Sequence, residues 1–167
     1  MKEMNKKGLW GKIILVLVIL ILIIAGYLVY VMFFTGASYS GKSIGEFSSE
    51  NLVVNEELIS ASLNEIGATS LHKNPFTRSK PVILFSVNES KFYATIDKTI
   101  ETKAGSVDGA DLEIVTTNEE FASILSKPDF NAALKESVEN GKTTVNVLSS
   151  ESNLAAKGYL SVYDNLK

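Results

Sequence analysis

The residues with the most recognisable chemical spacing in this sequence are 36–43, which match the phosphate-binding pattern G-x-x-x-x-G-K-[ST] without a mismatch. In nucleotide-binding proteins the backbone N–H groups of such a loop surround phosphates, while its Lys and Ser contact phosphate and magnesium. That chemistry requires a buried strand before the loop and a helix after it. Here the preceding apolar run is too long for a strand, and Gly45 weakens any helix that follows. Because glycine and serine crowd this stretch, we interpret it as a flexible tether, with nucleotide binding as a remote alternative.

The other polar residues form no stronger catalytic or metal-binding pattern. The chain has one histidine, His72, and no cysteine, so we expect the histidine to be solvated and expect no thiolate site. Glu119 and Glu120 are adjacent carboxylates, but acidic residues in a first helical turn complement the helix dipole. Asp108 and Asp111 resemble part of a calcium loop that lacks its remaining ligands. We therefore expect a non-enzymatic protein that uses no cofactor and no metal.

The element that must position everything else is the uncharged run over 13–34. Its 22 residues would form a helix of about 33 Å, enough to cross a hydrocarbon core of about 30 Å. Lysines outnumber acidic residues within 1–12, which biases the N-terminus toward the cytoplasm. We expect a single-pass protein of the cell membrane that contacts the lipid bilayer through 13–34, with its C-terminal domain outside the cytoplasm. A cleaved signal peptide is the alternative, although its apolar core usually runs only about 7–15 residues.

Composition divides the sequence into four parts. We expect a basic cytoplasmic head over 1–12, a transmembrane helix over 13–34, a Gly/Ser-rich linker over 35–48 and an α+β extracytoplasmic domain over 49–167. The last part is long enough for one compact domain with its own core. Because the chain is acidic overall, at −3, and its head is basic, the outer domain is acidic. Phosphate-backbone binding needs a basic face, so we expect no nucleic-acid partner.

Hydrophobic periodicity in the outer domain predicts helices and strands in a mixed order. A helix within 49–66, capped by Asn55, precedes a meander of four strands whose first hairpin tip carries the glycosylation acceptor Asn88-Glu89-Ser90. Two helices follow, the first starting at the capping box of Thr117 and the second opening at Pro128; a fifth strand and a final helix from Asn153 complete the domain. The expected strands are 81–87, 91–97, 98–103, 111–116 and 142–148. We predict an α+β fold in which a five-stranded, mostly antiparallel sheet packs against helices.

Several short patterns in this domain resemble the lipid-binding domain of sterol carrier protein type 2. They occur in that family's order and at similar spacings: Asp111-Leu112-Glu113-Ile114, Glu120-Phe121, Phe130 with Ala133-Leu134, Gly141-Lys142, and Leu154-Ala155. The resemblance covers residues 52–166. It departs from the family pattern where Ser152-Asn153 replaces the usual Gly-Asp, and in a longer segment before Gly141. Domains of that family are also usually intracellular.

The resemblance implies an apolar tunnel between the sheet and its helices that holds a fatty-acyl or sterol-like ligand without chemistry. The implied lining residues are Phe121, Ile124, Leu125, Phe130, Leu134, Val162 and Leu166. Apolar stripes at this spacing are more often ordinary core. The sequence therefore leaves two alternative functions open. The domain binds a lipid or another apolar small molecule, or it is an extracytoplasmic protein-interaction module with a filled core.

Overall fold

The computed structural model describes residues 6–34 and 36–166, and the chain divides into two compact units, Met1–Thr35 and Gly36–Lys167. The first unit contains the helix α1, Lys6–Phe34. Its side chains are described over 14–30, a stretch of about 26 Å along the helix axis. Within these limits, no described helix is long and apolar enough to cross a membrane. This finding contradicts the predicted transmembrane helix over 13–34 and the single-pass localisation, and it leaves the bilayer contact without support.

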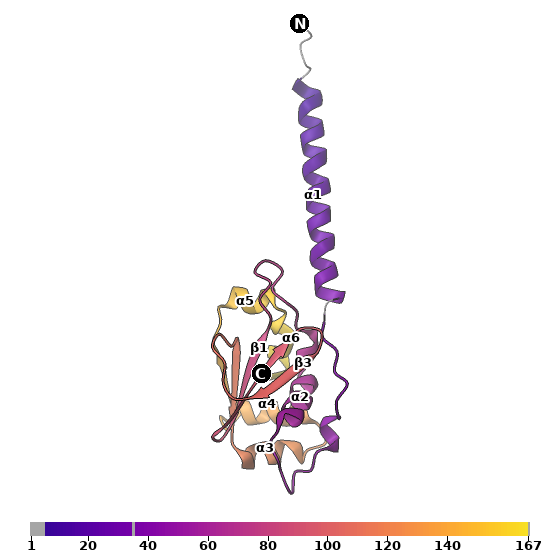
Figure 1. The fold of residues 1–167 in the computed structure, drawn as a ribbon. Helices are drawn as coiled ribbons and strands as arrows, with labels where there is room; N and C mark the ends of the chain where they lie inside the picture. The colour runs from indigo at the N-terminus through magenta and orange to yellow at the C-terminus, as the bar shows by residue number, and fades with distance from the viewer. Residues whose placement is uncertain (1–5, 35, 167) are drawn as a thin grey trace. The chain divides into compact units, whose positions relative to one another are not determined.

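The second unit is an α+β domain, as predicted (Figure 1). Its elements in chain order are η1 (Ile44–Glu46), α2 (Glu56–Glu65), η2 (Ala68–Ser70), β1 (Val82–Val87), β2 (Ser90–Ile96), β3 (Ile100–Ala104), β4 (Leu112–Thr116), α3 (Asn118–Leu125), α4 (Phe130–Glu139), β5 (Thr144–Val147), α5 (Glu151–Ala156) and α6 (Tyr159–Leu166).

The five-stranded sheet is mixed, which corrects the prediction of a mostly antiparallel meander. Its strand order is β3-β2-β1-β4-β5, and β4 pairs with β1 in parallel rather than with β3. Strand β1 is buried along nearly its whole length, so it needs a neighbour on each side and takes the centre of the sheet. Strand β3 exposes Glu101 and Lys103, which suit an edge strand. The chain therefore crosses back from β3 to the free side of β1.

Side-chain caps begin most of the helices, and two of the predicted caps are present. Asn55 Oδ1 accepts from the Leu58 N–H at 2.9 Å, and Thr117 Oγ1 accepts from the Glu120 N–H at 3.1 Å. The helix that was predicted to open at Pro128 is α4, and Asp129 caps it instead. The last predicted helix is two helices, because the chain breaks at Gly158, whose φ is +84°.

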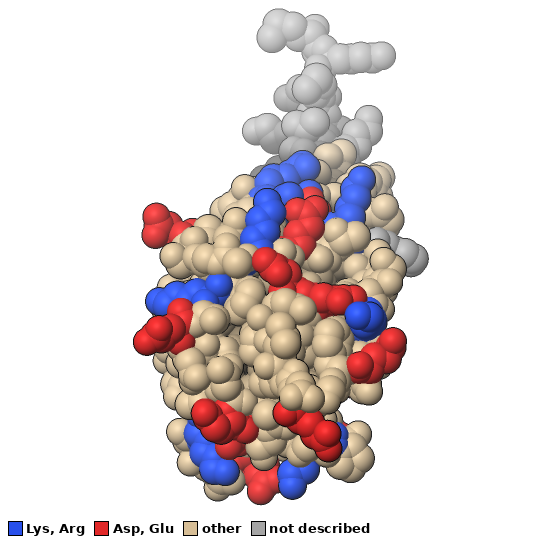
Figure 2. Space-filling view, turned by 60° about the horizontal axis from the view of Figure 1, so that its bottom comes forward, with Lys and Arg blue, Asp and Glu red and all other residues tan. Residues whose placement is uncertain are grey.

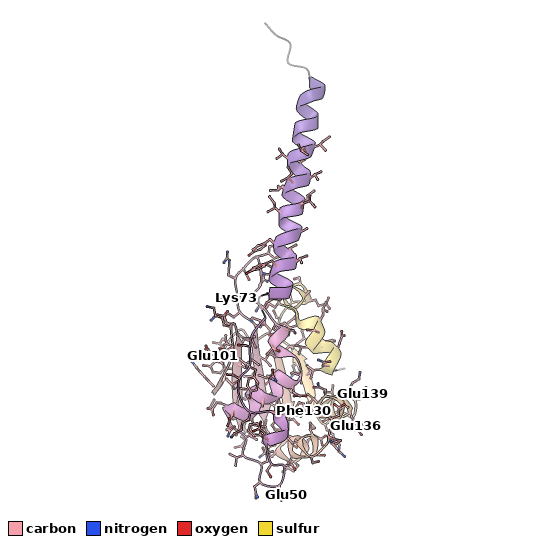
Figure 3. All side chains as sticks on the ribbon, turned by 90° about the vertical axis from the view of Figure 1, so that its right-hand side faces the viewer. Glu50, Lys73, Glu101, Phe130, Glu136 and Glu139 are labelled. Atoms are coloured by element: carbon pink, nitrogen blue, oxygen red, sulfur yellow. The ribbon has the colours of Figure 1, made fainter. Side chains whose placement is uncertain are left out.

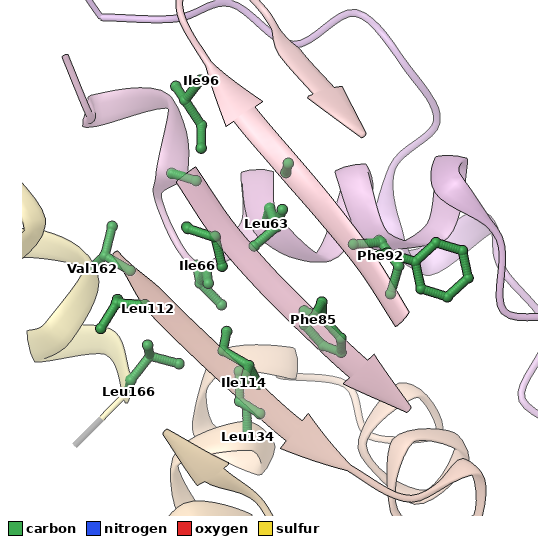
Figure 4. Packing of buried hydrophobic residues seen from close by; sticks show 14 of the residues in the cluster. Leu63, Ile66, Phe85, Phe92, Ile96, Leu112, Ile114, Leu134, Val162 and Leu166 are labelled. Carbon is green, nitrogen blue, oxygen red and sulfur yellow. The ribbon is translucent and has the colours of Figure 1, made fainter. Parts of the chain in front are cut away.

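The core lies between one face of the sheet and the helix layer (Figure 4). Alternate residues of β1, β2 and β4 point into it, including Phe85, Phe92 and Ile114. They meet buried side chains from α2, α3, α4 and α6, among them Leu63 and Val162. On the molecular face drawn in Figure 2, acidic and basic side chains are interspersed.

Residues 36–47 begin the second unit and pack against the rest of it. The Ala37 N–H donates to Thr69 O, and the Ser38 N–H donates to Lys98 O, each at 2.8 Å. Lys42 pairs with Glu57 at 3.3 Å. Ser43 begins η1 rather than an α-helix, so this stretch lacks the strand–loop–helix context that a phosphate-binding loop requires.

Candidate functional site

An open apolar groove of about 490 Å³ lies between the β5 edge of the sheet and the helices α5 and α6. Its volume falls within the range of roughly 300–1,000 Å³ that is typical of small-molecule sites. The lining residues come from four elements: Leu112 of β4, Val147 of β5, Glu151, Leu154 and Ala155 of α5, and Tyr159, Leu160 and Tyr163 of α6.

The groove is open because the helix layer stops short of the edge strand. Val147 pairs with Leu112, so both side chains point to the same face of the sheet. Leu112 is fully buried, whereas Val147 keeps 46% of its surface exposed and Leu160 keeps 68%. Such a gathering of exposed apolar side chains is typical of a binding surface.

A buried ion pair fixes the turn between α5 and α6. Lys157 Nζ donates to both carboxylate oxygens of Asp111, at 2.8 and 2.9 Å, and to Lys80 O at 2.8 Å. The lysine is 3% exposed and the aspartate 1%. The three contacts use all three protons of the ammonium group. A buried charge is tolerated when its protons have such hydrogen-bond partners.

Asp111 also accepts hydrogen bonds from three other elements. The Val82 N–H donates to it at 2.8 Å, Asn153 Nδ2 at 3.1 Å and the Tyr159 hydroxyl at 3.1 Å. We call Asp111, Asn153, Lys157 and Tyr159 the Asp111 cluster. It joins the start of β1 and the residue preceding β4 to both C-terminal helices. The wall of the groove is therefore held against the sheet by charge-assisted hydrogen bonds.

The Tyr159 hydroxyl should make the stability of the domain sensitive to high pH. Burial, reinforced by the negative charge of Asp111, raises the pKa of Tyr159 far above its ordinary value of 10.0. Below about pH 10 the phenol is protonated in both the folded and the unfolded chain, so the stabilisation is fully present. Above that pH only the unfolded chain releases the proton, and the free energy of unfolding should fall by about 1.4 kcal/mol per pH unit.

Comparing the wild type with Tyr159→Phe isolates this effect. Urea unfolding measured at several values between about pH 9 and pH 11 should show a steeper loss for the wild type than for the variant. Parallel pH profiles of the two proteins would contradict the assignment.

The seven residues predicted to line a tunnel lie in or against the core. Six are buried and the seventh, Leu125, packs against them half-buried. None of the seven lines the apolar groove. Two smaller, mainly polar hollows touch three of them: Ile124 borders one of about 120 Å³, and Leu125 and Phe130 border one of about 340 Å³. A ligand-lining role for Phe121, Ile124, Leu125, Phe130, Leu134, Val162 and Leu166 stays a prediction.

Helix α6 lines the groove with residues that the sequence did not predict as ligand-lining. Val162 and Leu166 turn to the core, whereas Leu160 and Tyr163 turn to the groove. Leu160 is not among the lining residues that the resemblance implied, and an apolar side chain away from the buried face of the helix was an available signal. The burial of Asp111 left no local signal, because its partners lie 29 to 48 residues away.

His72 is buried rather than solvated. Its side chain is 6% exposed and its Nδ1 lies 3.1 Å from Lys73 O. A Cβ at Gly158 would lie 3.3 Å from the imidazole ring, so a glycine there allows the α5–α6 turn to approach the ring closely. The histidine therefore supports the same turn that the Asp111 cluster fixes.

Comparison with known proteins identifies similar solved structures but no family. No family model matches the chain, and no curated protein matches it. A solved structure of a UbiJ-SCP2 ubiquinone synthesis protein is similar, at 11% identity, covering 71% of this chain and 88% of that one with a TM-score of 0.34. Palmitated SCP2L2 from Aedes aegypti is similar at 13% identity, covering 59% of this chain and 84% of that one, also with a TM-score of 0.34. Both titles contain SCP2, the name of the family that the sequence resembles. A TM-score of 0.34 supports no conclusion about the site.

Proposed function

We propose that the second unit binds an elongated apolar ligand in the groove between β5 and the helices α5 and α6. The observation that carries this proposal is the apolar lining of a 490 Å³ groove in which Val147 and Leu160 remain exposed. Burying an aliphatic side chain of this size against a ligand contributes about 1.5–3 kcal/mol. The ligand would replace water over these side chains.

Two further features support binding without chemical conversion. The Asp111 cluster holds the groove wall in place before any ligand arrives, which limits the entropy lost on binding. Among the described lining residues, the ionisable groups are Glu151 and two tyrosines. None of the described lining residues is a serine, cysteine, lysine or histidine, the side chains that most often supply a nucleophile and its base.

Leu160→Glu should weaken the binding of a neutral apolar probe by at least about tenfold, because it removes buried apolar contact and places a charge in the groove. The probe is N-phenyl-1-naphthylamine, whose fluorescence rises in apolar surroundings, titrated into the purified full-length protein. Leu160 is largely exposed in the free protein, so the fold should survive the substitution.

Phe76→Glu is the matched control. Phe76 is 80% exposed and lies outside the groove, so the variant makes the same charge change on another apolar surface residue. Helix α1 also exposes apolar side chains, and any probe bound there contributes equally to all three proteins. Equal probe affinity in the two variants would contradict the proposal.

A further inference from the structure

Among the described residues of β4, β5, α5 and α6, the exposed charged side chains are acidic. Its lining contains one charged residue, Glu151, in the first turn of α5. Among the described residues, no hydrogen bond or ion pair engages the Glu151 carboxylate. Asp164 is exposed on α6 one turn beyond Leu160, so it lies on the same side of that helix.

Of the described residues, the two lysines nearest in the chain to β5, α5 and α6 are already paired. Lys157 is buried and donates its protons to Asp111 and a backbone carbonyl. Lys142, two residues before β5, contacts Glu120 at 3.3 Å. Of the described residues in β4, β5, α5 and α6, none is a lysine or an arginine. Glu113 of β4 points to the other face of the sheet, where Ser86 and Asn146 donate to it.

We infer that the groove selects apolar ligands with a neutral or cationic head group and disfavours carboxylates, phosphates and sulfates. The inference rests on the proposed function and narrows its ligand class. An anionic head near Glu151 would meet a like charge at the edge of an apolar surface, where repulsion is stronger than in bulk water. A hydroxyl or an ammonium group would instead be able to donate a hydrogen bond to the carboxylate.

Displacement of N-phenyl-1-naphthylamine from the full-length protein by three ligands with the same twelve-carbon chain tests this selectivity. Dodecanol and dodecylamine should displace the probe at concentrations roughly threefold to tenfold lower than dodecanoate, with each ligand kept below its solubility or micellar limit. Equal potency of the alcohol and the carboxylate would overturn the inference. If all three ligands compete and Leu160→Glu abolishes their binding, the proposed groove stands and only its charge selectivity fails. If none of the three ligands displaces the probe and Leu160→Glu leaves probe binding unchanged, the groove is not a binding site and the proposed function fails.

Reversing the charge at Glu151 should reverse the order of the ligands. Glu151→Lys should bring dodecanoate ahead of dodecylamine and change the affinity for dodecanol least, whereas Glu151→Gln should reduce both the penalty on the carboxylate and the advantage of the amine. The control is Glu101→Lys, the same change on β3 at the opposite edge of the sheet, labelled in Figure 3. An unchanged order in both Glu151 variants, or an equal change in the Glu101 variant, would overturn the inference.

Discussion

Asp111→Asn is expected to lower the free energy of unfolding of the second unit by about 3–5 kcal/mol, as measured by urea unfolding of the full-length protein. The substitution keeps the size of the side chain but removes the charge that faces Lys157 Nζ at 2.8 Å. The ammonium would then be buried without a counter-ion, and it has no route to water without moving the α5–α6 turn. The loss is the desolvation of that charge rather than the net value of the pair.

A chemically identical change at the surface provides the control. Asp97 contacts Lys73 at 2.8 Å and Lys80 at 3.0 Å, but all three side chains are partly exposed. Asp97→Asn should therefore cost less than about 1 kcal/mol. Adding Lys157→Met to Asp111→Asn removes the unpaired ammonium and should recover about 1–2 kcal/mol. If Asp111→Asn is no more destabilising than Asp97→Asn, the buried pair does not hold the helices.

Phe121→Ala is expected to destabilise the same unit by about 3–5 kcal/mol. Phe121 is fully buried, and its ring centroid lies 5.4 Å from that of Phe85 on the central strand. Truncation removes the aromatic contact and leaves a cavity that the close-packed surroundings fill only in part.

Phe76→Ala is the matched truncation of a phenylalanine that is 80% exposed, and it should change the free energy of unfolding by less than about 0.5 kcal/mol. The comparison also separates the two interpretations of the predicted lining residues. A filled core predicts the full difference between the variants. A loss below about 1.5 kcal/mol at Phe121 would instead indicate that its ring faces an open space, as a ligand tunnel requires.

Local sequence patterns predicted much of the secondary structure of this domain correctly. The alternation of Phe92, Ala94 and Ile96 with polar residues marks β2, and these three side chains do point into the core. Asn55 and Thr117 cap α2 and α3 as expected. These features were predictable because a cap or a strand face depends on residues within a few positions of one another.

The partner of each strand could not be predicted in the same way. The predicted four-strand meander placed β4 beside β3 in the sheet, but β4 lies beside β1, with Ile83 opposite Leu112. Backbone hydrogen bonds are available to any strand of suitable length. These hydrogen bonds therefore do not select the partner. The arrangement that forms is the one that buries the most apolar surface, including both faces of β1.

The sequence alone determined that the domain is α+β and where most of its apolar side chains lie along the helices and strands. Only the tertiary structure decided which of them become core and which remain exposed as a binding surface. Val162 and Leu160 differ little in apolar character, yet one packs over β4 and the other faces the groove. The reason is physical: an apolar side chain is covered only when another element lies over it, and the end of the helix layer at β5 is set by contacts between residues far apart in the chain.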